Sequence, residues 1–185
     1  MRRTLLSVSL LALAAPRLLS AQAQQAKPAS ASPVADAFRM QESHFAKVLT
    51  AAADLMPADK YAYKPTPAQM SFADIVVHLV EANDGLCAMV ANTKAPQHAA
   101  VTAASPKDSL VAQLKSSFDF CTTSFAKLTD ANLADQQSMY GMSGNRAFWF
   151  FVNVADWSDH YSQFANYMRL NGVLPPTARP RSSTP

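Results

Sequence analysis

An acid and an imidazole stand one helical turn apart in the segment DWSDHYSQF, which begins at Asp156. At about 100° per residue, Asp156 and His160 lie roughly 40° apart on the same side of a helix. Trp149, Phe164 and Tyr167 fall on that side too, which indicates that it faces the protein interior. A carboxylate facing a core is costly unless it is ion-paired, hydrogen-bonded or bound to a metal. The segment therefore predicts a buried polar site that uses one of these three solutions.

His78 is the third residue of this candidate site. It lies just beyond Ile75, at the border of the apolar face of another predicted helix. If the middles of the two helices align, His78 faces Asp156 and His160. Two imidazoles and one carboxylate form a ligand set that leaves positions open for water or substrate. The alternative is that His78 is a core-edge histidine hydrogen-bonded to a neighbour.

Four further polar residues could orient such ligands or hold a bound water: His44, Glu81, Asp159 and Gln163. Each of them has an ordinary alternative as a solvated or boundary position on a helix. Four aromatic residues either line the mouth of a pocket or belong to the core: Phe148, Trp149, Phe150 and Trp157. His98 carries no signal of a role.

Four amphipathic segments must position these residues. Apolar residues recur at three- and four-residue steps over residues 34–55, 72–90, 110–128 and about 145–171. Start signals precede the first three segments, at Ser32-Pro33, at the capping-box-like Ser71-Phe72-Ala73-Asp74 and at Ser105-Pro106. Gly172 ends the last segment. With four glycines and no alternating strand pattern, the sequence predicts an all-α, four-helix bundle over residues 33–176.

The first 23 residues predict a cleaved signal peptide. Met1-Arg2-Arg3 is basic, an apolar run extends from Leu5 to Ala15, and Ala21-Gln22-Ala23 offers a small-x-small cleavage site. The run is too short to span a bilayer, and no cysteine follows it to carry a lipid. We therefore expect a secreted or periplasmic protein with no stable membrane anchor after cleavage. Residues 24–32 are a predicted flexible linker, and residues 177–185 are a predicted disordered tail.

Removal of the signal peptide also removes the positive charge. Lys+Arg falls from 16 to 13 against 13 Asp+Glu, so the mature chain is formally neutral. This balance provides no electrostatic footprint for nucleic acid, which we therefore do not expect as a partner. The sequence also contains no Gly-rich phosphate loop and no G-x-S-x-G nucleophile motif.

Cys87 and Cys121 are the only cysteines. An even count in an exported chain favours a disulfide. If their helices are antiparallel and joined by the 92–104 loop, however, Cys87 lies about one turn before the loop and Cys121 about four turns into the third helix. The alternative is two buried free thiols that act as small apolar side chains.

Two segments carry a resemblance to a known family: LMPADKYAYKPTPAQMSFADIVVHLVEAN and DWSDHYSQFANYMRLNGVLPP. From about Val34 to Pro176 the chain resembles the DinB-like (damage-inducible, DinB/YfiT) superfamily of metal-binding four-helix bundles. The first segment resembles the family's proline-rich approach to a metal-ligand histidine, here His78. The second resembles its helix-four motif, in which two histidines four residues apart supply two more ligands. His160 matches the second of these, whereas Asp156 stands where the typical pattern has histidine.

The resemblance implies a divalent metal ion held by His78, Asp156 and His160, with zinc first and nickel or iron as other options. Family members with assigned chemistry include metal-dependent transferases and isomerases that use small thiols. Because small thiols are hard to keep reduced outside the cytoplasm, hydrolysis suits an exported protein better. The expected partner is a small molecule that the sequence does not name, and a homodimer is one assembly open to the chain. The alternative is a non-catalytic helical binding or stress-related module with a polar core network instead of a metal site.

Overall fold

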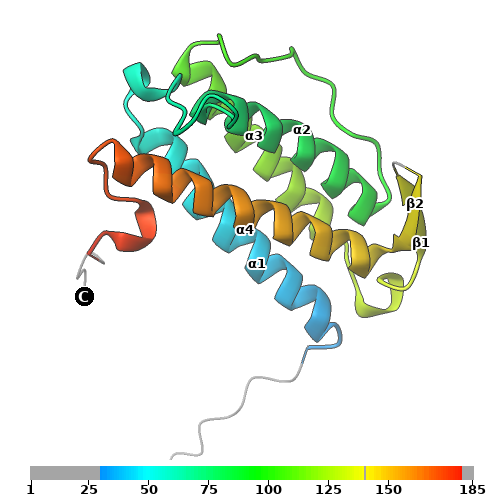
Figure 1. Cartoon of the computed structure of the whole chain (residues 1–185). Coiled ribbons are helices and arrows are strands. Elements are labelled where there is room, and N and C mark those ends of the chain that lie inside the picture. The colour runs from blue at the N-terminus through cyan, green and yellow to red at the C-terminus, as the bar shows by residue number, and fades with distance from the viewer. Residues whose placement is uncertain (1–29, 140, 181–185) are drawn as a thin grey trace, which may run out of the picture.

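Four helices make up most of the described chain, which comprises residues 30–139 and 141–180 of a computed structural model (Figure 1). They are α1 (Pro33–Leu55), α2 (Phe72–Ala91), α3 (Lys107–Phe125) and α4 (Arg146–Leu170), and three short 3₁₀ turns accompany them: η1 (Ala58–Lys60), η2 (Asp130–Asn132) and η3 (Pro176–Ala178). The prediction of four helices is confirmed. Within the described residues, none of the helices combines the length and the apolar character that a membrane crossing needs.

Both ends of the chain carry predictions that fall wholly or partly outside the described residues. The signal peptide, residues 1–23, lies outside them, as do the linker up to residue 29 and residues 181–185 of the tail. The tail prediction is wrong at its start, because Thr177 belongs to η3. The Tyr161 hydroxyl donates to Thr177 Oγ1 at 2.8 Å and accepts from the Thr177 backbone N–H at 3.1 Å.

Polar side chains cap the first turns of α2 and α4, and the capping box at the start of α2 confirms its prediction. Ser71 Oγ accepts from the Asp74 N–H at 3.0 Å, and the Asp74 carboxylate accepts from the Ser71 N–H at 2.9 Å. This reciprocal pair is a capping box, which satisfies N–H groups that the helix itself leaves unpaired. At α4, the side chain of Asn145 accepts from the Phe148 N–H at 2.8 Å.

The start of α1 differs from its prediction. Ser32 precedes the helix, but its side chain makes no capping hydrogen bond. The carboxylate of Asp130 in η2 instead accepts from the N–H groups of Val34 and Ala35, at 3.3 and 2.9 Å. A residue 95 positions away in the sequence thus replaces the local cap.

The helices α2 and α3 run parallel. Asn83 of α2 donates to Ser117 of α3 at 2.9 Å, and Cys87 of α2 is bonded to Cys121 of α3, so the residue numbers rise together along both helices. The expectation that these helices are antiparallel is therefore wrong. Because α2 is about 30 Å long, residues 92–106 must travel back along it before α3 can begin. Figure 1 shows this connection passing back over the bundle.

His98 attaches the connection between α2 and α3, residues 92–106, to α2. Its Nε2 lies 2.5 Å from Oδ2 of Asp84, a mostly buried residue of α2. This hydrogen bond is the main reason that the pKa of His98 is raised above its ordinary value. No local pattern predicts a role for His98, because this contact depends on the path of the connection.

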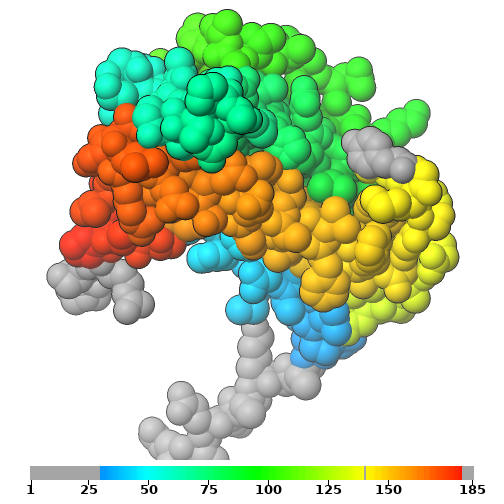
Figure 2. Space-filling view, viewed as in Figure 1, coloured from blue at the N-terminus to red at the C-terminus, as the bar shows by residue number. Residues whose placement is uncertain are grey.

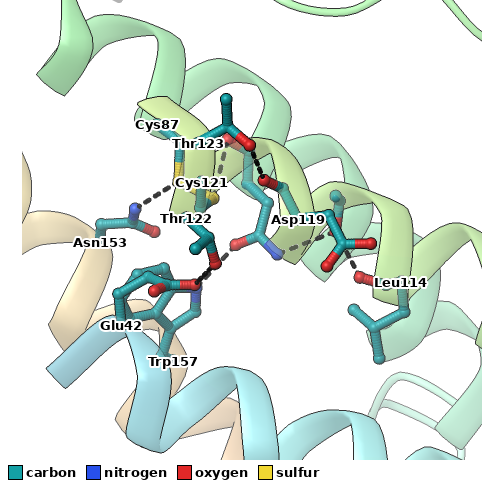
Figure 3. The surroundings of a disulfide bond; sticks show 11 residues. Glu42, Cys87, Leu114, Asp119, Cys121, Thr122, Thr123, Asn153 and Trp157 are labelled. Atoms are coloured by element: carbon teal, nitrogen blue, oxygen red, sulfur yellow. Dashed lines mark hydrogen bonds between the residues drawn. A yellow bond between two sulfur atoms is a disulfide. The ribbon is translucent and has the colours of Figure 1, made fainter. Parts of the chain in front are cut away.

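The parallel arrangement resolves the question of the cysteines. Cys87 and Cys121 form a disulfide, with Cα atoms 5.2 Å apart, and both are fully buried (Figure 3). The mismatch in height expected for antiparallel helices does not arise. Asn153 of α4 donates to Cys87 Sγ at 3.2 Å, so the bridge joins α2 to α3 and also contacts α4.

A short hairpin precedes α4, where the sequence analysis expected no strands. β1 (Gln136–Met139) pairs antiparallel with β2 (Met142–Asn145), from Gln136 opposite Asn145 to Met139 opposite Met142. Four-residue strands are too short to display a clear alternation of apolar and polar residues. Trp149 of α4 donates through its indole N–H to the Gln137 carbonyl at 3.3 Å, which ties the hairpin to the bundle.

Replacing both Cys87 and Cys121 with alanine is expected to lower the free energy of unfolding by about 3–4 kcal/mol, because the bridge closes a loop with a sequence separation of 34. Urea titration followed by far-ultraviolet circular dichroism measures the change. Wild-type protein under reducing conditions should approach the variant. Equal unfolding midpoints for the oxidised wild type and the variant would show that the bridge does not stabilise the fold.

Candidate metal centre

The three residues singled out from the sequence meet between α2 and α4. His78 Nε2 lies 3.0 Å from Asp156 Oδ1, and His160 Nε2 lies 3.3 Å from the same oxygen. The two imidazole rings are 4.6 Å apart between centroids. One candidate ligand atom from each residue can be chosen so that all lie within 4.8 Å of one another. The predicted convergence of the three side chains is present in the structure.

The packing of α4 against α2 produces this meeting. The two helices run antiparallel, since Arg146, at the start of α4, donates to the Val90 carbonyl near the end of α2 at 2.6 Å. Asp156 and His160 follow one another on the face of α4 that meets α2, as their spacing predicts. The side chains are 20% and 9% exposed respectively, whereas His78 is 41% exposed. The cluster is therefore closed to solvent at His160 and open to solvent at His78.

The charges in the cluster are strongly coupled. Burial acts to raise the pKa of Asp156, but the hydrogen bonds and charges of His160 and His78 outweigh it and lower that pKa to about 2. The hydrogen bond to Asp156 raises the pKa of His78 against the opposing effect of burial, and the charges of Asp156 and Glu81 add to the increase. The carboxylate is thus an anion at any physiological pH.

Two buried atoms of the cluster lack hydrogen-bond partners in the described part of the chain: Asp156 Oδ2 and His160 Nδ1. A buried anion with an unused oxygen is expensive, and a bound cation would offset that cost. In a tetrahedral zinc site with bonds of 2.0–2.2 Å, ligand atoms lie about 3.3–3.6 Å apart. The distances from Asp156 Oδ1 to the two Nε2 atoms come close to this spacing. The residues present therefore fit a divalent metal ion.

Asp159 and Gln163 do not orient His160 as the sequence analysis allowed. The Gln163 amide donates to Asp159 Oδ2 at 2.8 Å, so these side chains pair with each other on the outer side of α4. No described residue hydrogen-bonds to Nδ1 of His160, the ring nitrogen that such an orienting residue would contact. Asp159 is three residues after Asp156, but it lies on the exposed side of the helix.

His44 lies away from the cluster, and Glu81 lies beside it. The ring of His44 packs against Phe45, and its side chain lines two open hollows on the surface of α1, of about 670 and 620 Å³. Neither hollow includes His78, Asp156 or His160. Glu81 lines a smaller cavity of about 230 Å³ that opens directly onto His78 and Asp156.

Of the four aromatic residues named from the sequence, three are buried and one is exposed. Phe150 and Trp157 are buried in the core, whereas Phe148 is exposed. Trp149 is buried and also forms part of the cavity wall. Sequence reasoning missed Met142 of β2 as a wall residue, since nothing predicted the hairpin that carries it.

Comparison with known proteins identifies the family. Residues 23–163 match the sequence profile of the DinB superfamily, which covers well over half of the chain. The chain belongs to the DinB superfamily. The resemblance noted in the sequence is thereby confirmed. No curated protein matches the chain.

Two solved structures share the fold of this DinB superfamily member. A DinB-like protein from Bacillus cereus ATCC 10987 is similar with a TM-score of 0.65 and 12% identity, over 76% of this chain and 95% of that one. A DinB-like protein from Bacillus subtilis (YjoA) is similar with a TM-score of 0.62 and 18% identity, over 77% of this chain and 99% of that one. At these identities the likeness shows the fold alone.

Substituting Asp156→Asn in metal-free protein is expected to lower the pKa of His78, because the anionic hydrogen-bond partner is lost while the burial remains. Titration of the histidine ring signals by NMR measures this change. His98, paired with Asp84, serves as the control and should keep its raised pKa in the variant.

The sign of the linked stability change follows from the same pKa. The pKa of His78 in the folded protein lies above its ordinary value of 6.5, so protonated His78 stabilises the metal-free fold. This stabilisation is fully present below pH 6.5 and is lost as the pH rises through the raised pKa. An unchanged His78 titration in Asp156→Asn would contradict the coupling.

Proposed function

We propose that this protein is an exported, divalent-metal-dependent hydrolase that holds its metal ion through His78, Asp156 and His160. The observation that supports the proposal most strongly is the buried Asp156 carboxylate, whose only described partners are two imidazole nitrogens at 3.0 and 3.3 Å. Three protein ligands leave a metal position open, which is typical of catalytic rather than structural zinc. Zinc is the favoured ion, and nickel or iron(II) suits the same donors.

A metal ion bound here would supply Lewis acidity, which polarises a carbonyl or phosphoryl oxygen and makes a bound water more acidic. The protein's own residues set the conditions for this chemistry. Asp156 provides a fixed negative charge with a pKa of about 2, so it stays ionised throughout the working range. His160 lies on the closed side of the cluster, while His78 borders the cavity through which a substrate would enter.

Glu81 is the residue we propose for proton transfer. It lies one turn after His78 on α2 and lines the cavity with it. A carboxylate at the edge of a metal site can accept a proton from an attacking water and pass it to a leaving group. Its exposure allows it to exchange that proton with solvent.

Because we propose that the protein is exported, we favour hydrolysis over the thiol-dependent chemistry that the family resemblance implies. It is supported by the basic, apolar and small-residue pattern of the first 23 residues. Small thiols are poorly maintained in an oxidising compartment, whereas water is always present as a co-substrate. A buried disulfide is also consistent with such a compartment.

A non-catalytic role is the second candidate, and one observation favours it. Without a metal ion, both imidazoles already contact Asp156 Oδ1, His78 by a hydrogen bond and His160 at 3.3 Å, so Asp156 has two partners inside the protein. A polar network of this kind can hold two helices in register without any chemistry. In this case added metal would leave the stability unchanged.

Protein isolated from the periplasm, without refolding or a nickel column, is expected to contain about one metal ion per chain, as measured by inductively coupled plasma mass spectrometry. His78→Ala should lose it, because two protein ligands seldom retain a divalent ion. Asp156→His should keep it, because imidazole is an equally good ligand for zinc. His44→Ala is the matched control, since His44 lies outside the cluster, and it should keep the wild-type content.

Activity provides the second part of the test. Metal-loaded protein should hydrolyse neutral aryl esters above the rate of the His78→Ala variant, and a chelator should abolish the difference until zinc is restored. Metal-free native protein whose unfolding temperature does not change on addition of zinc, nickel or iron(II) would exclude the metalloenzyme and favour the polar network.

A further inference from the structure

The cavity beside the cluster is built from three elements of the chain. It has a volume of about 230 Å³ and is lined by His78, Glu81, Ala82 and Leu86 of α2, Trp149, Val152 and Asp156 of α4, and Met142 of β2. Figure 2 shows the surface where α2, the hairpin and the first half of α4 come together. Two of the three candidate metal ligands, His78 and Asp156, lie at one end of the cavity, and Leu86, Trp149 and Met142, which the proposed chemistry does not use, line the rest.

The walls away from the ligands are apolar and held in place. The indole of Trp149 is fixed by its hydrogen bond to the Gln137 carbonyl, and the residue is only 1% exposed. Leu86 is 8% exposed and belongs to the core. Met142 is 49% exposed, so an apolar side chain stands open to water at the edge of the cavity. A ligand with an apolar group would cover this side chain and gain from its desolvation.

The volume limits the size of that group. Sites for drug-sized molecules occupy roughly 300–1,000 Å³, and this cavity is smaller. An apolar cavity of about 150 Å³ holds a benzene molecule. The cavity therefore has room for one ring or a branched alkyl chain together with a short polar head.

The charges around the cavity limit the charge of the ligand. Among the described residues that line the cavity, Glu81 and Asp156 provide carboxylates, and none is a lysine or arginine. A negative charge on the apolar end of a ligand would be repelled by Glu81, and the proposed metal ion lies at the opposite end of the cavity.

We infer that this cavity binds the apolar end of the substrate, a single aryl or branched-alkyl group that is uncharged or cationic, with the scissile bond placed at His78 and Asp156. The inference rests on the proposed function and adds to it a substrate class and a set of specificity-determining residues. Met142, Val152 and Leu86 select for the apolar group, and Glu81 selects against acids.

Two hydroxamic acids that differ only in their apolar part test the inference by isothermal titration calorimetry on the zinc-loaded chain. Acetohydroxamic acid presents a methyl group and benzohydroxamic acid a phenyl ring on the same metal-binding head. We expect benzohydroxamic acid to bind at least about tenfold more tightly. A tenfold change corresponds to about 1.4 kcal/mol, which the burial of about 55 Å² of apolar surface provides.

Variants of residues that line the cavity show which side chains cause the preference for benzohydroxamic acid over acetohydroxamic acid. Met142→Ala should weaken benzohydroxamic acid about threefold and leave acetohydroxamic acid unchanged, because Met142 contacts only the apolar group. Val152→Phe should fill the cavity and remove the preference. Met40→Ala is the matched control, because Met40 is an exposed methionine on α1, outside the cavity, and its loss should change neither affinity.

A third probe tests the charge. We expect 4-carboxybenzohydroxamic acid to bind several-fold more weakly than benzohydroxamic acid, and Glu81→Gln to reduce that difference. Equal affinities of the methyl and phenyl probes for protein that holds zinc would overturn the inference and leave the proposed metal site intact. Failure of both probes to bind zinc-loaded protein would overturn the inference as well. A chain that takes up no zinc, nickel or iron(II) would overturn the proposed function itself, and the inference with it.

Discussion

The burial of one carboxylate, Asp156, is the constraint on which the arrangement around the site depends. Its side chain is 20% exposed, and its pKa is held at about 2 because His160 and His78 approach the same oxygen. His160 reaches this oxygen from one turn further along α4, whereas His78 reaches it only because α2 packs beside α4 at this level of the bundle. Because a buried anion is costly without partners, the packing of α2 against α4 and the positions of His78, Asp156 and His160 depend on one another.

The rest of the bundle keeps α2 at the required position. The disulfide from Cys87 to Cys121 joins it to α3, and the pair of His98 with Asp84 joins it to the connection that returns along its length. The buried Arg146 joins it to the start of α4 through the Val90 carbonyl. These three contacts lie in the second half of α2, which follows His78, and they attach that half to α3, to α4 and to the connection between α2 and α3.

Local patterns predicted the fold class and the three candidate ligands. The capping box at Ser71 and the spacing of Asp156 and His160 are properties of short segments, and short segments can be interpreted without knowing the topology. The parallel course of α2 and α3 depends on the path of a long connection, and so do the contacts of His98. The cap that Asp130 provides for α1 and the cavity wall at Met142 also join segments that are far apart in the sequence. No period or motif encodes such contacts.

The most direct measurement of the central claim is an anomalous-difference map from a crystal of protein isolated from its native compartment, collected at the absorption edge of the metal it contains. The account predicts one strong peak per chain within about 2.0–2.2 Å of His78 Nε2, His160 Nε2 and an oxygen of Asp156. A map without a peak at these residues, in protein whose three side chains still hydrogen-bond one another, would contradict the metal centre.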